Sequence, residues 1–157
     1  MMTEEEAFIR ACRYCSGAEH CRREVDAMLK RCQIDEISAV RILDRLEKEN
    51  YIDEKRYAKA FVHDKLLFCR WGRVKINYAL QQKCIPGNII DEALSSIDQD
   101  EYYSVLKSAA DSFRRTVKGT NGYERNMHLL KRLCSRGFEQ SIVSKVLKMS
   151  ESSEEQD

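Results

Sequence analysis

The stretch VDAMLKRCQIDEISAVRIL, residues 25–43, recurs in pattern as INYALQQKCIPGNIIDEAL at residues 76–94 and as LLKRLCSRGFEQSIVSKVL at residues 129–147. Each copy has an amphipathic run that ends in Leu, a short break with one apolar residue, and a second amphipathic run. The matched apolar positions are Val25, Leu29, Ile34, Ala39, Ile42 and Leu43, then Ile76, Leu80, Ile85, Ile90, Ala93 and Leu94, and finally Leu129, Leu133, Phe138, Val143, Val146 and Leu147. A period of about 50 residues is typical of repeat architectures, whose units bury their apolar faces partly against their neighbours.

A further amphipathic run precedes each copy, so the pattern predicts three helices per unit and an all-α fold. We expect a tandem array of three three-helix repeats, helix-turn-helix-like, that is elongated and curved. The expected repeats are residues 1–50, 51–98 and 99–149, and a disordered acidic tail is expected at residues 150–157.

Capping signals predict where the helices begin and end. Thr3 followed by three Glu is typical of an N-cap, and Gly17 closes the first helix. A second helix is expected over residues 19–31 and a third over residues 35–49, and Asp53 is expected to cap the next. Later breaks are expected at Trp71-Gly72 and at residues 118–122, and Pro86-Gly87 is expected to form the first turn of the helix that follows Lys83.

Charge is segregated along the chain, although the net charge is only +1. Residues 54–83 hold eight Lys or Arg and two acids, residues 84–104 hold five acids and neither Lys nor Arg, and residues 105–136 hold eight Lys or Arg and two acids. A purely structural role does not require two basic blocks, so we expect them to form the working surface. The candidate residues for contact with a partner or DNA are Arg56, Lys59, Lys65, Arg70, Arg73, Lys75, Lys83, Arg114, Arg115, Lys118, Arg125, Lys131, Arg132 and Arg136.

The sequence is that expected of a cytoplasmic monomer that does not enter membranes. It has no run of 18 apolar residues, and its start, MMTEEEAF, is acidic where a secretory signal would be basic and then apolar. The seven cysteines, an odd number, are expected to be reduced thiols.

One cluster has the composition of a zinc site. Cys12, Cys15, His20 and Cys21 lie within ten residues and would supply four ligands. However, Cys12 and Cys15 also fall in the apolar stripe of the first predicted helix, where a free Cys behaves as a small hydrophobe. We therefore favour core thiols and expect no bound metal, with zinc as the alternative.

Catalytic patterns are lacking in the sequence. His20, His63 and His128 fall in different repeats and have no local Ser, Asp or Cys arrangement of a nucleophilic site. Lys118-Gly119-Thr120 is similar to the end of a Walker motif but lacks the upstream glycine and strand. We expect neither enzymatic activity nor a cofactor.

Aromatic residues alternate with basic ones in the central block, at Tyr57, Phe61, Phe68, Trp71 and Tyr78. Such alternation would allow base stacking and phosphate pairing, but a packed helix with a solvated basic face explains it equally well. Helical spacing places Phe61 in the core.

A base-reading helix-turn-helix is disfavoured. In the second copy the helix that would enter the major groove carries Asn88, Asp91 and Glu92 but no Lys or Arg, so phosphates would repel it.

Residues 51–62 (YIDEKRYAKAFV), 71–76 (WGRVKI) and 80–85 (LQQKCI) resemble the signature of the RecX family of recombination regulators. Arg136-Gly137-Phe138 fits as well, and the resemblance covers nearly the whole chain in length and layout. The chain departs from the family at Cys84, where Gly is usual, at Lys65, where Arg is common, and at Arg73, where Pro often follows Gly.

The resemblance implies a curved array that lies in the groove of the RecA filament and suppresses filament growth, strand exchange and ATP hydrolysis, without catalytic residues of its own. It implies a role in DNA repair, recombination and the SOS response, with single-stranded DNA reached through the filament. The basic blocks would then face either an acidic groove lining or the enclosed DNA. An independent, non-specific nucleic-acid binder is the alternative function, and a scaffold for some other protein is a third.

Overall fold

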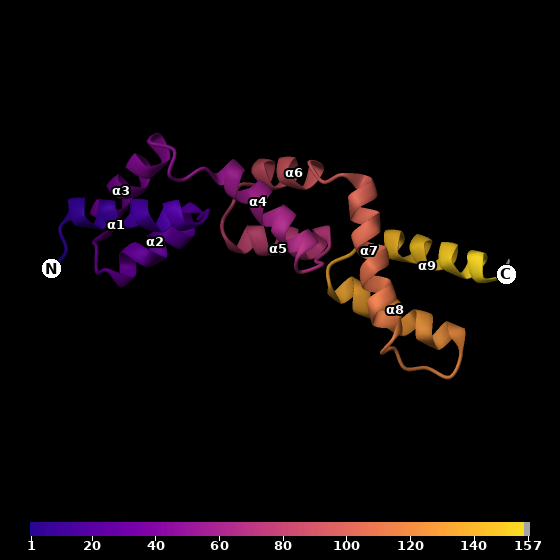
Figure 1. Ribbon diagram of the computed structural model, residues 1–157. Coiled ribbons are helices and arrows are strands. Elements are labelled where there is room, and N and C mark those ends of the chain that lie inside the picture. The colour runs from indigo at the N-terminus through magenta and orange to yellow at the C-terminus, as the bar shows by residue number, and fades with distance from the viewer. Residues whose placement is uncertain (156–157) are drawn as a thin grey trace. The chain divides into compact units, whose positions relative to one another are not determined.

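The computed structural model describes the backbone of residues 1–155 and the side chains of residues 1–148. Within those residues it contains nine α-helices and no strand, which confirms the predicted all-α fold (Figure 1). The helices are α1 (Glu4–Gly17), α2 (Arg22–Arg31), α3 (Glu36–Lys48), α4 (Glu54–Leu67), α5 (Arg73–Gln82), α6 (Gly87–Ser95), α7 (Gln99–Arg114), α8 (Gly122–Ser135) and α9 (Gln140–Glu155). None of them, as far as the chain is described, is long and apolar enough to cross a membrane.

The helix starts follow the predicted caps, with one correction. Thr3 and Glu6 form a capping box at α1, and the Asp53 carboxylate accepts the backbone N–H of Arg56 at 3.1 Å. The second helix, expected from residue 19, begins only at Arg22. The reason is local, because the Glu24 carboxylate accepts the backbone N–H of Cys21 at 3.1 Å and so holds Cys21 at the cap position.

The C-terminal end also differs from the expectation. The sequence predicts a disordered tail from residue 150, whereas helix α9 continues to Glu155. Its last residues are Ser and Glu, and Glu favours the continuation of a helix that is already formed. Residues 156–157 lie outside the described part of the chain, and the division at residues 50 and 98 into three repeats stays a prediction.

The three matched breaks have the same backbone geometry. Each contains one residue with positive φ: Gln33 (61°), Cys84 (59°) and Gly137 (96°). The next residue donates its N–H to the carbonyl of the matched Leu: Ile34 to Leu29 at 3.1 Å, Ile85 to Leu80 at 3.2 Å and Phe138 to Leu133 at 3.3 Å. This is the Schellman ending of a helix, in which a left-handed residue turns the chain and the residue after it packs back on the helix.

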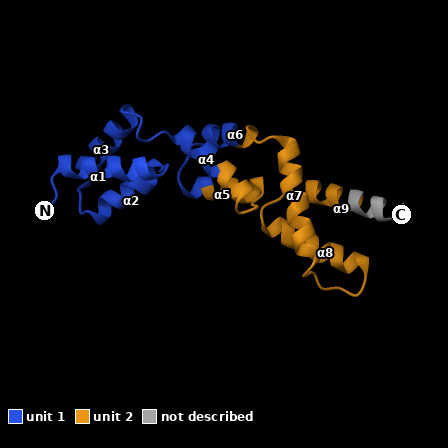
Figure 2. Cartoon of the chain, viewed as in Figure 1, with its two compact units in different colours: residues 1–61, 80–93 blue, residues 62–79, 94–157 orange. Residues whose placement is uncertain are grey.

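The repeat pattern also predicts the core. Leu29, Leu80 and Leu133 are fully buried, and among the matched apolar positions only Ile34 and Leu94 are half-buried rather than buried. The chain divides into two compact units, residues 1–61 with 80–93 and residues 62–79 with 94–157 (Figure 2). We call them unit 1 and unit 2, and the three helices of the middle repeat contribute to both.

In unit 2, Gly72 and the first turn of α5 pack backbone to backbone on the break between α8 and α9. The N–H of Gly72 donates to the Arg136 carbonyl and the N–H of Val74 to the Gly137 carbonyl, both at 2.9 Å. A Cβ on Gly72 would lie 2.4 Å from backbone atoms of Gly137 and Phe138. Both glycines are therefore required by this contact, which we call the Gly72–Gly137 contact.

Candidate basic interface

The structure sorts the predicted basic residues by what their side chains contact. Four pair with carboxylates: Arg56, Arg73, Lys83 and Arg114. Four lie over aromatic rings: Lys65, Lys75, Arg132 and Arg136. The remaining six, within the described residues, have no ion pair, hydrogen bond or ring contact at the side chain: Lys59, Arg70, Arg115, Lys118, Arg125 and Lys131. The last group is the one that remains available to a partner.

Arg73 belongs to the fold rather than to an open surface. Its guanidinium pairs with Glu139 at 2.9 Å and lies 3.9 Å from the centre of the Tyr102 ring. Its backbone N–H donates to the Tyr102 hydroxyl at 3.1 Å, and that hydroxyl in turn donates to Glu139. Burial is the main cause that raises the pKa of Tyr102, so this hydroxyl keeps its proton. Reversing the charge of Arg73 would thus perturb the interior of unit 2 as well as the surface.

The other carboxylate pairs are more exposed. Arg56 contacts Glu19 and Asp53, Lys83 lies 3.5 Å from Glu24, and Arg114 lies 3.2 Å from Asp111. Such surface pairs contribute little to stability, typically about 0–1 kcal/mol. Each pair nevertheless neutralises a positive charge that the sequence predicts to be available to a partner.

Four further cations lie over the faces of two aromatic rings. The ammonium groups of Lys65 and Lys75 lie 4.7 and 4.5 Å from the centre of the Trp71 ring. The Phe113 ring is contacted in the same way by Arg132 at 4.1 Å and by Arg136 at 5.6 Å. Cation–π contacts of this kind hold the side chain in place but leave its charge.

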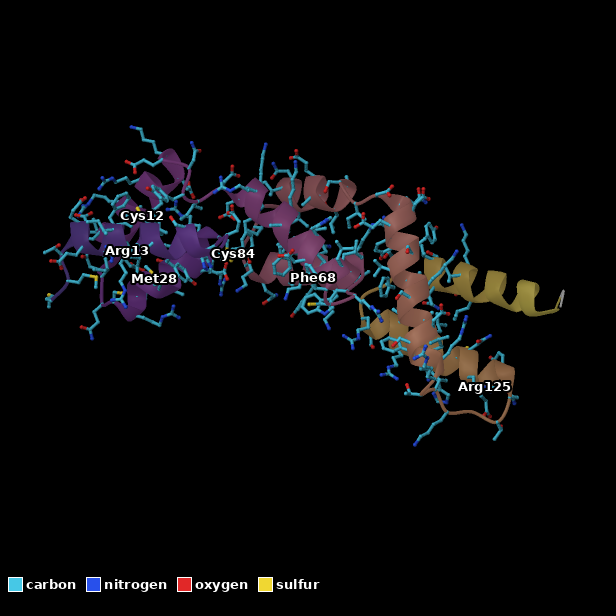
Figure 3. The ribbon with its side chains drawn as sticks, in the orientation of Figure 1. Cys12, Arg13, Met28, Phe68, Cys84 and Arg125 are labelled. Carbon is cyan, nitrogen blue, oxygen red and sulfur yellow. The ribbon has the colours of Figure 1, made fainter. Side chains whose placement is uncertain are left out.

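Most of the predicted stacking aromatics are not open to a base. Tyr57 is buried and contacts the half-buried ring of Phe61, and Trp71 is flanked by its two lysines. Phe68, which directly follows α4 (Figure 3), is 81% exposed, and Tyr78 is 63% exposed. Of the five, these two are the ones that a nucleic acid could reach.

Five of the six available basic residues belong to unit 2; Lys59 is the one in unit 1. Arg70 and Arg115 line a common cavity in unit 2 together with Lys107, which the sequence did not single out. Lys118 lies between α7 and α8, and Lys131 is exposed on α8. Arg125 is also exposed on α8 (Figure 3). The signal that would have found Lys107 is its helical spacing from Arg115 on the polar face of α7.

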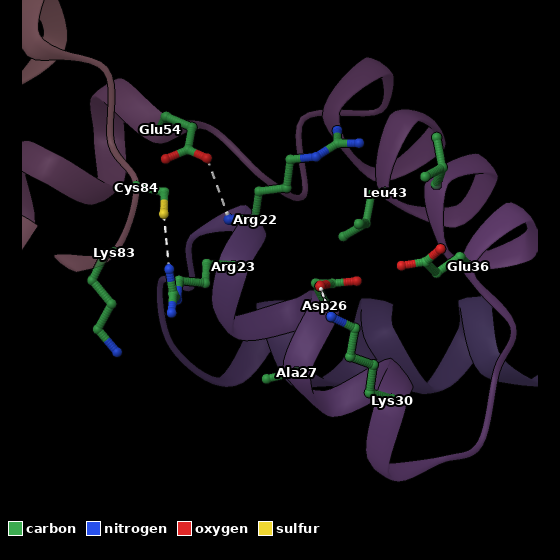
Figure 4. Close-up of a pocket in the computed structure, with 11 residues that line it drawn as sticks. Arg22, Arg23, Asp26, Ala27, Lys30, Glu36, Leu43, Glu54, Lys83 and Cys84 are labelled. Carbon is green, nitrogen blue, oxygen red and sulfur yellow. Dashed lines mark hydrogen bonds and ion pairs between the residues drawn. The ribbon is translucent and has the colours of Figure 1, made fainter. Parts of the chain in front are cut away.

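A second cavity, in unit 1, is lined by charged residues of both signs (Figure 4). Arg22 pairs with Asp44 and Glu47, each at 3.0 Å, and Lys30 pairs with Asp26 at 3.1 Å. Arg23 donates a hydrogen bond to the sulfur of Cys84 at 2.8 Å, and burial raises the pKa of Glu54. The cations of this cavity thus each have a partner within unit 1, which distinguishes them from Arg70 and Arg115 of the unit 2 cavity.

The Cys and His cluster near the N-terminus is packed into unit 1. Cys21 is fully buried, and burial raises the pKa of both Cys15 and Cys21 to about 11. The His20 ring stacks on Tyr14 with ring centres 3.7 Å apart. In the described residues, no three His, Cys, Asp or Glu side chains lie together so that they could hold a metal ion.

Comparison with known proteins identifies the family. A family model described as RecX, second three-helix domain, matches residues 53–94. The regulatory protein RecX of Chlorobaculum tepidum is 31% identical over 93% of this chain and 89% of its own length, and that of Chlorobium phaeobacteroides is 32% identical over 92% and 93%. The regulatory protein RecX of Clostridium botulinum (strain Eklund 17B) is 38% identical, over 73% of this chain and 54% of its own length.

Solved structures agree on the fold. The crystal structure of RecX from Lactobacillus salivarius is 20% identical, with a TM-score of 0.83 over 93% of this chain and 95% of that one. The family follows from the sequence identity over nearly the full length of two relatives and from the matched second domain. The chain belongs to the RecX family of regulatory proteins.

Proposed function

We propose that this protein binds the RecA–DNA filament and regulates it, mainly by inhibiting recombination and ATP hydrolysis by RecA. It acts through binding alone, as a cytoplasmic factor in DNA repair and recombination and in the SOS response. Family membership supports the regulatory role.

One observation carries the choice of partner surface, namely the five available basic side chains of unit 2. These side chains are exposed and have no ion pair within the described residues, whereas most basic residues of unit 1 that line its cavity are paired. A filament of protein on DNA is rich in negative charge, and unpaired cations both attract such a target and gain affinity by releasing its counterions. Unit 2 is therefore the part of the chain that is expected to contact the filament.

A matched pair of charge-reversal variants tests this function. The first changes Arg115, Lys118 and Lys131 to Glu in unit 2. The control changes Arg10, Arg13 and Arg31 to Glu in unit 1, where these three side chains are likewise exposed and without ion pairs in the described chain. Both variants shift the net charge equally, and each includes one arginine at the C-terminal end of a helix.

The readouts are inhibition of RecA strand exchange and of its DNA-dependent ATPase, with circular dichroism as a check on folding. We expect the unit 2 variant to need at least tenfold more protein for half inhibition and the unit 1 variant to behave like the wild type. Equal losses in both variants would reduce the effect to net charge. Failure of the wild type to inhibit RecA would overturn the function itself, and binding to naked DNA but not to filaments would favour an independent nucleic-acid binder.

A further inference from the structure

We infer that the cavity of unit 2 lined by Arg70 and the polar face of α7 binds successive phosphate groups of a single-stranded nucleic acid. This inference rests on the function proposed above, because the filament encloses DNA.

The first observation concerns the two faces of α7. Tyr102, Leu106 and Ala109 are fully buried on one face. On the other face Ser104, Ser108 and Ser112 follow one another at four-residue spacing and line the cavity.

Three cations border this line of hydroxyls. Arg70, Lys107 and Arg115 line the same cavity, and all three are exposed. No carboxylate, hydroxyl or ring holds their side chains anywhere in the part of the chain that the structure describes. Asp111 also lines the cavity, but it pairs with Arg114 at 3.2 Å. The cavity therefore has a net positive charge that nothing inside the described protein neutralises.

The backbone fixes Arg70 at this position. Its φ of 53° is left-handed, and the residue after it, Trp71, donates its N–H to the carbonyl of Lys65 at 3.0 Å. Arg70 thus lies in a tight turn at the end of α4, not on a loose loop. A cation held by a turn loses less conformational entropy on binding than one on a flexible segment.

The donors in the cavity favour phosphate over carboxylate. Two guanidinium groups, one ammonium and three hydroxyls together present many more N–H and O–H donors than one carboxylate, with two oxygens, can accept. A nucleic-acid strand offers charged oxygens at every nucleotide, and both Arg and Ser commonly donate to them. The line from Ser104 to Ser112 rises by roughly 12 Å along the helix, which suits a series of phosphates better than one isolated anion.

A single strand fits this site better than a duplex. Phe68, two residues before Arg70, is 81% exposed and makes no ring contact within the described structure. An exposed ring two residues away from a cation of the cavity can stack on an unpaired base, which a duplex does not offer.

The salt dependence of binding to oligo(dT) tests the inference without RecA. For a single strand, a plot of log affinity against log salt concentration has a negative slope, and each phosphate contact that is lost makes this slope shallower by about 0.7. The variant with Arg70, Lys107 and Arg115 changed to Ala is therefore expected to have a slope shallower by about 2, and its affinity should fall at least tenfold at low salt. The unit 1 control, with Arg10, Arg13 and Arg31 changed to Ala, should keep the wild-type slope. Circular dichroism and thermal melting verify that all variants are folded.

A second variant separates the hydroxyls from the cations. Changing Ser104, Ser108 and Ser112 to Ala removes donors but no charge, so affinity should fall several-fold while the slope stays that of the wild type. A lack of any effect from both cavity variants, or no detectable binding of oligo(dT) by the wild type, overturns the inference.

Inhibition of RecA, measured on the same samples, distinguishes the two proposals. If the variant of Arg70, Lys107 and Arg115 loses inhibition but keeps the wild-type affinity and salt slope for oligo(dT), the cavity faces the RecA protein and the phosphate assignment is wrong. If the wild type shows the expected DNA slopes but does not inhibit RecA, the phosphate site stands and the proposed function fails.

Discussion

The Gly72–Gly137 contact allows a sharp test of the fold, through the substitution Gly72→Ala. The added Cβ would lie 2.4 Å from three backbone atoms of Gly137 and Phe138, and backbone atoms cannot rotate aside as a side chain can. The segment before α5 must therefore move away from the break between α8 and α9. That movement weakens two hydrogen bonds of 2.9 Å, each worth about 0.5–1.5 kcal/mol, and adds an overpacking cost of about 1–3 kcal/mol. The expected loss in the free energy of unfolding is roughly 2–6 kcal/mol.

The assay is urea unfolding followed by far-UV circular dichroism. Gly17→Ala and Gly87→Ala are the controls, because a Cβ at either position meets nothing within 4 Å and both residues belong to helices. The controls should leave stability unchanged or raise it by up to about 1 kcal/mol, since Ala favours the helix over Gly. A Gly72→Ala protein within about 0.5 kcal/mol of the wild type would refute the close backbone packing in unit 2, as this is the range of a neutral surface change.

Three further predictions concern the repeat turns and the cysteines. Changing the matched leucines Leu29, Leu80 and Leu133 singly to Ala should each lower the free energy of unfolding by about 2–5 kcal/mol, because all three are fully buried; a near-zero loss at one of them would show that the repeat register is wrong there. Cys84→Gly should raise the free energy of unfolding by about 0.5–1 kcal/mol in the same assay, since a left-handed φ of 59° strains any residue with a Cβ. A lower free energy of unfolding would mean that the contact of the thiol with Arg23 outweighs that strain. Iodoacetamide at pH 8 should label the exposed Cys84 quickly and Cys21 only on unfolding. Burial raises the pKa of Cys21 to about 11, and its reactive thiolate forms only as the pH rises toward that value. Rapid labelling of Cys21, mapped by mass spectrometry, would contradict its burial.

Local sequence signals were sufficient to predict the helices and the faces that they bury. The spacing of Leu29 and Ile34, repeated twice, predicts both the buried side and the turn, because helical period and chain reversal are set by neighbours in sequence. The same reasoning misplaced the start of α2 because a carboxylate three residues later, on Glu24, holds the cap position. It also placed Phe61 in the core, whereas that side chain is half-buried.

The candidate interface was harder to predict because charge pairing acts across long stretches of chain. Arg73 and Glu139 are 66 positions apart, and nothing near either residue indicates that they meet. Counting charges along the sequence therefore included cations that the fold neutralises. Lys107 and the serines of α7 carried a usable signal, since their spacing places them on one helix face, but linking that face to Arg70 required the tertiary structure.

The left-handed turns have a consequence for the interchangeability of the repeats. Gln33, Cys84 and Gly137 occupy equivalent turns, but Gly137 packs closely against another backbone segment, where a Cβ would lie 2.5 Å from the backbone nitrogen of Lys75. A chimaera that replaced the third copy with the first would put Gln33 at that position and could not close the contact with Gly72. The copies are thus alike in fold but not exchangeable as modules, and artificial arrays that lengthen this chain by repeating one copy need a glycine wherever two copies meet in this way.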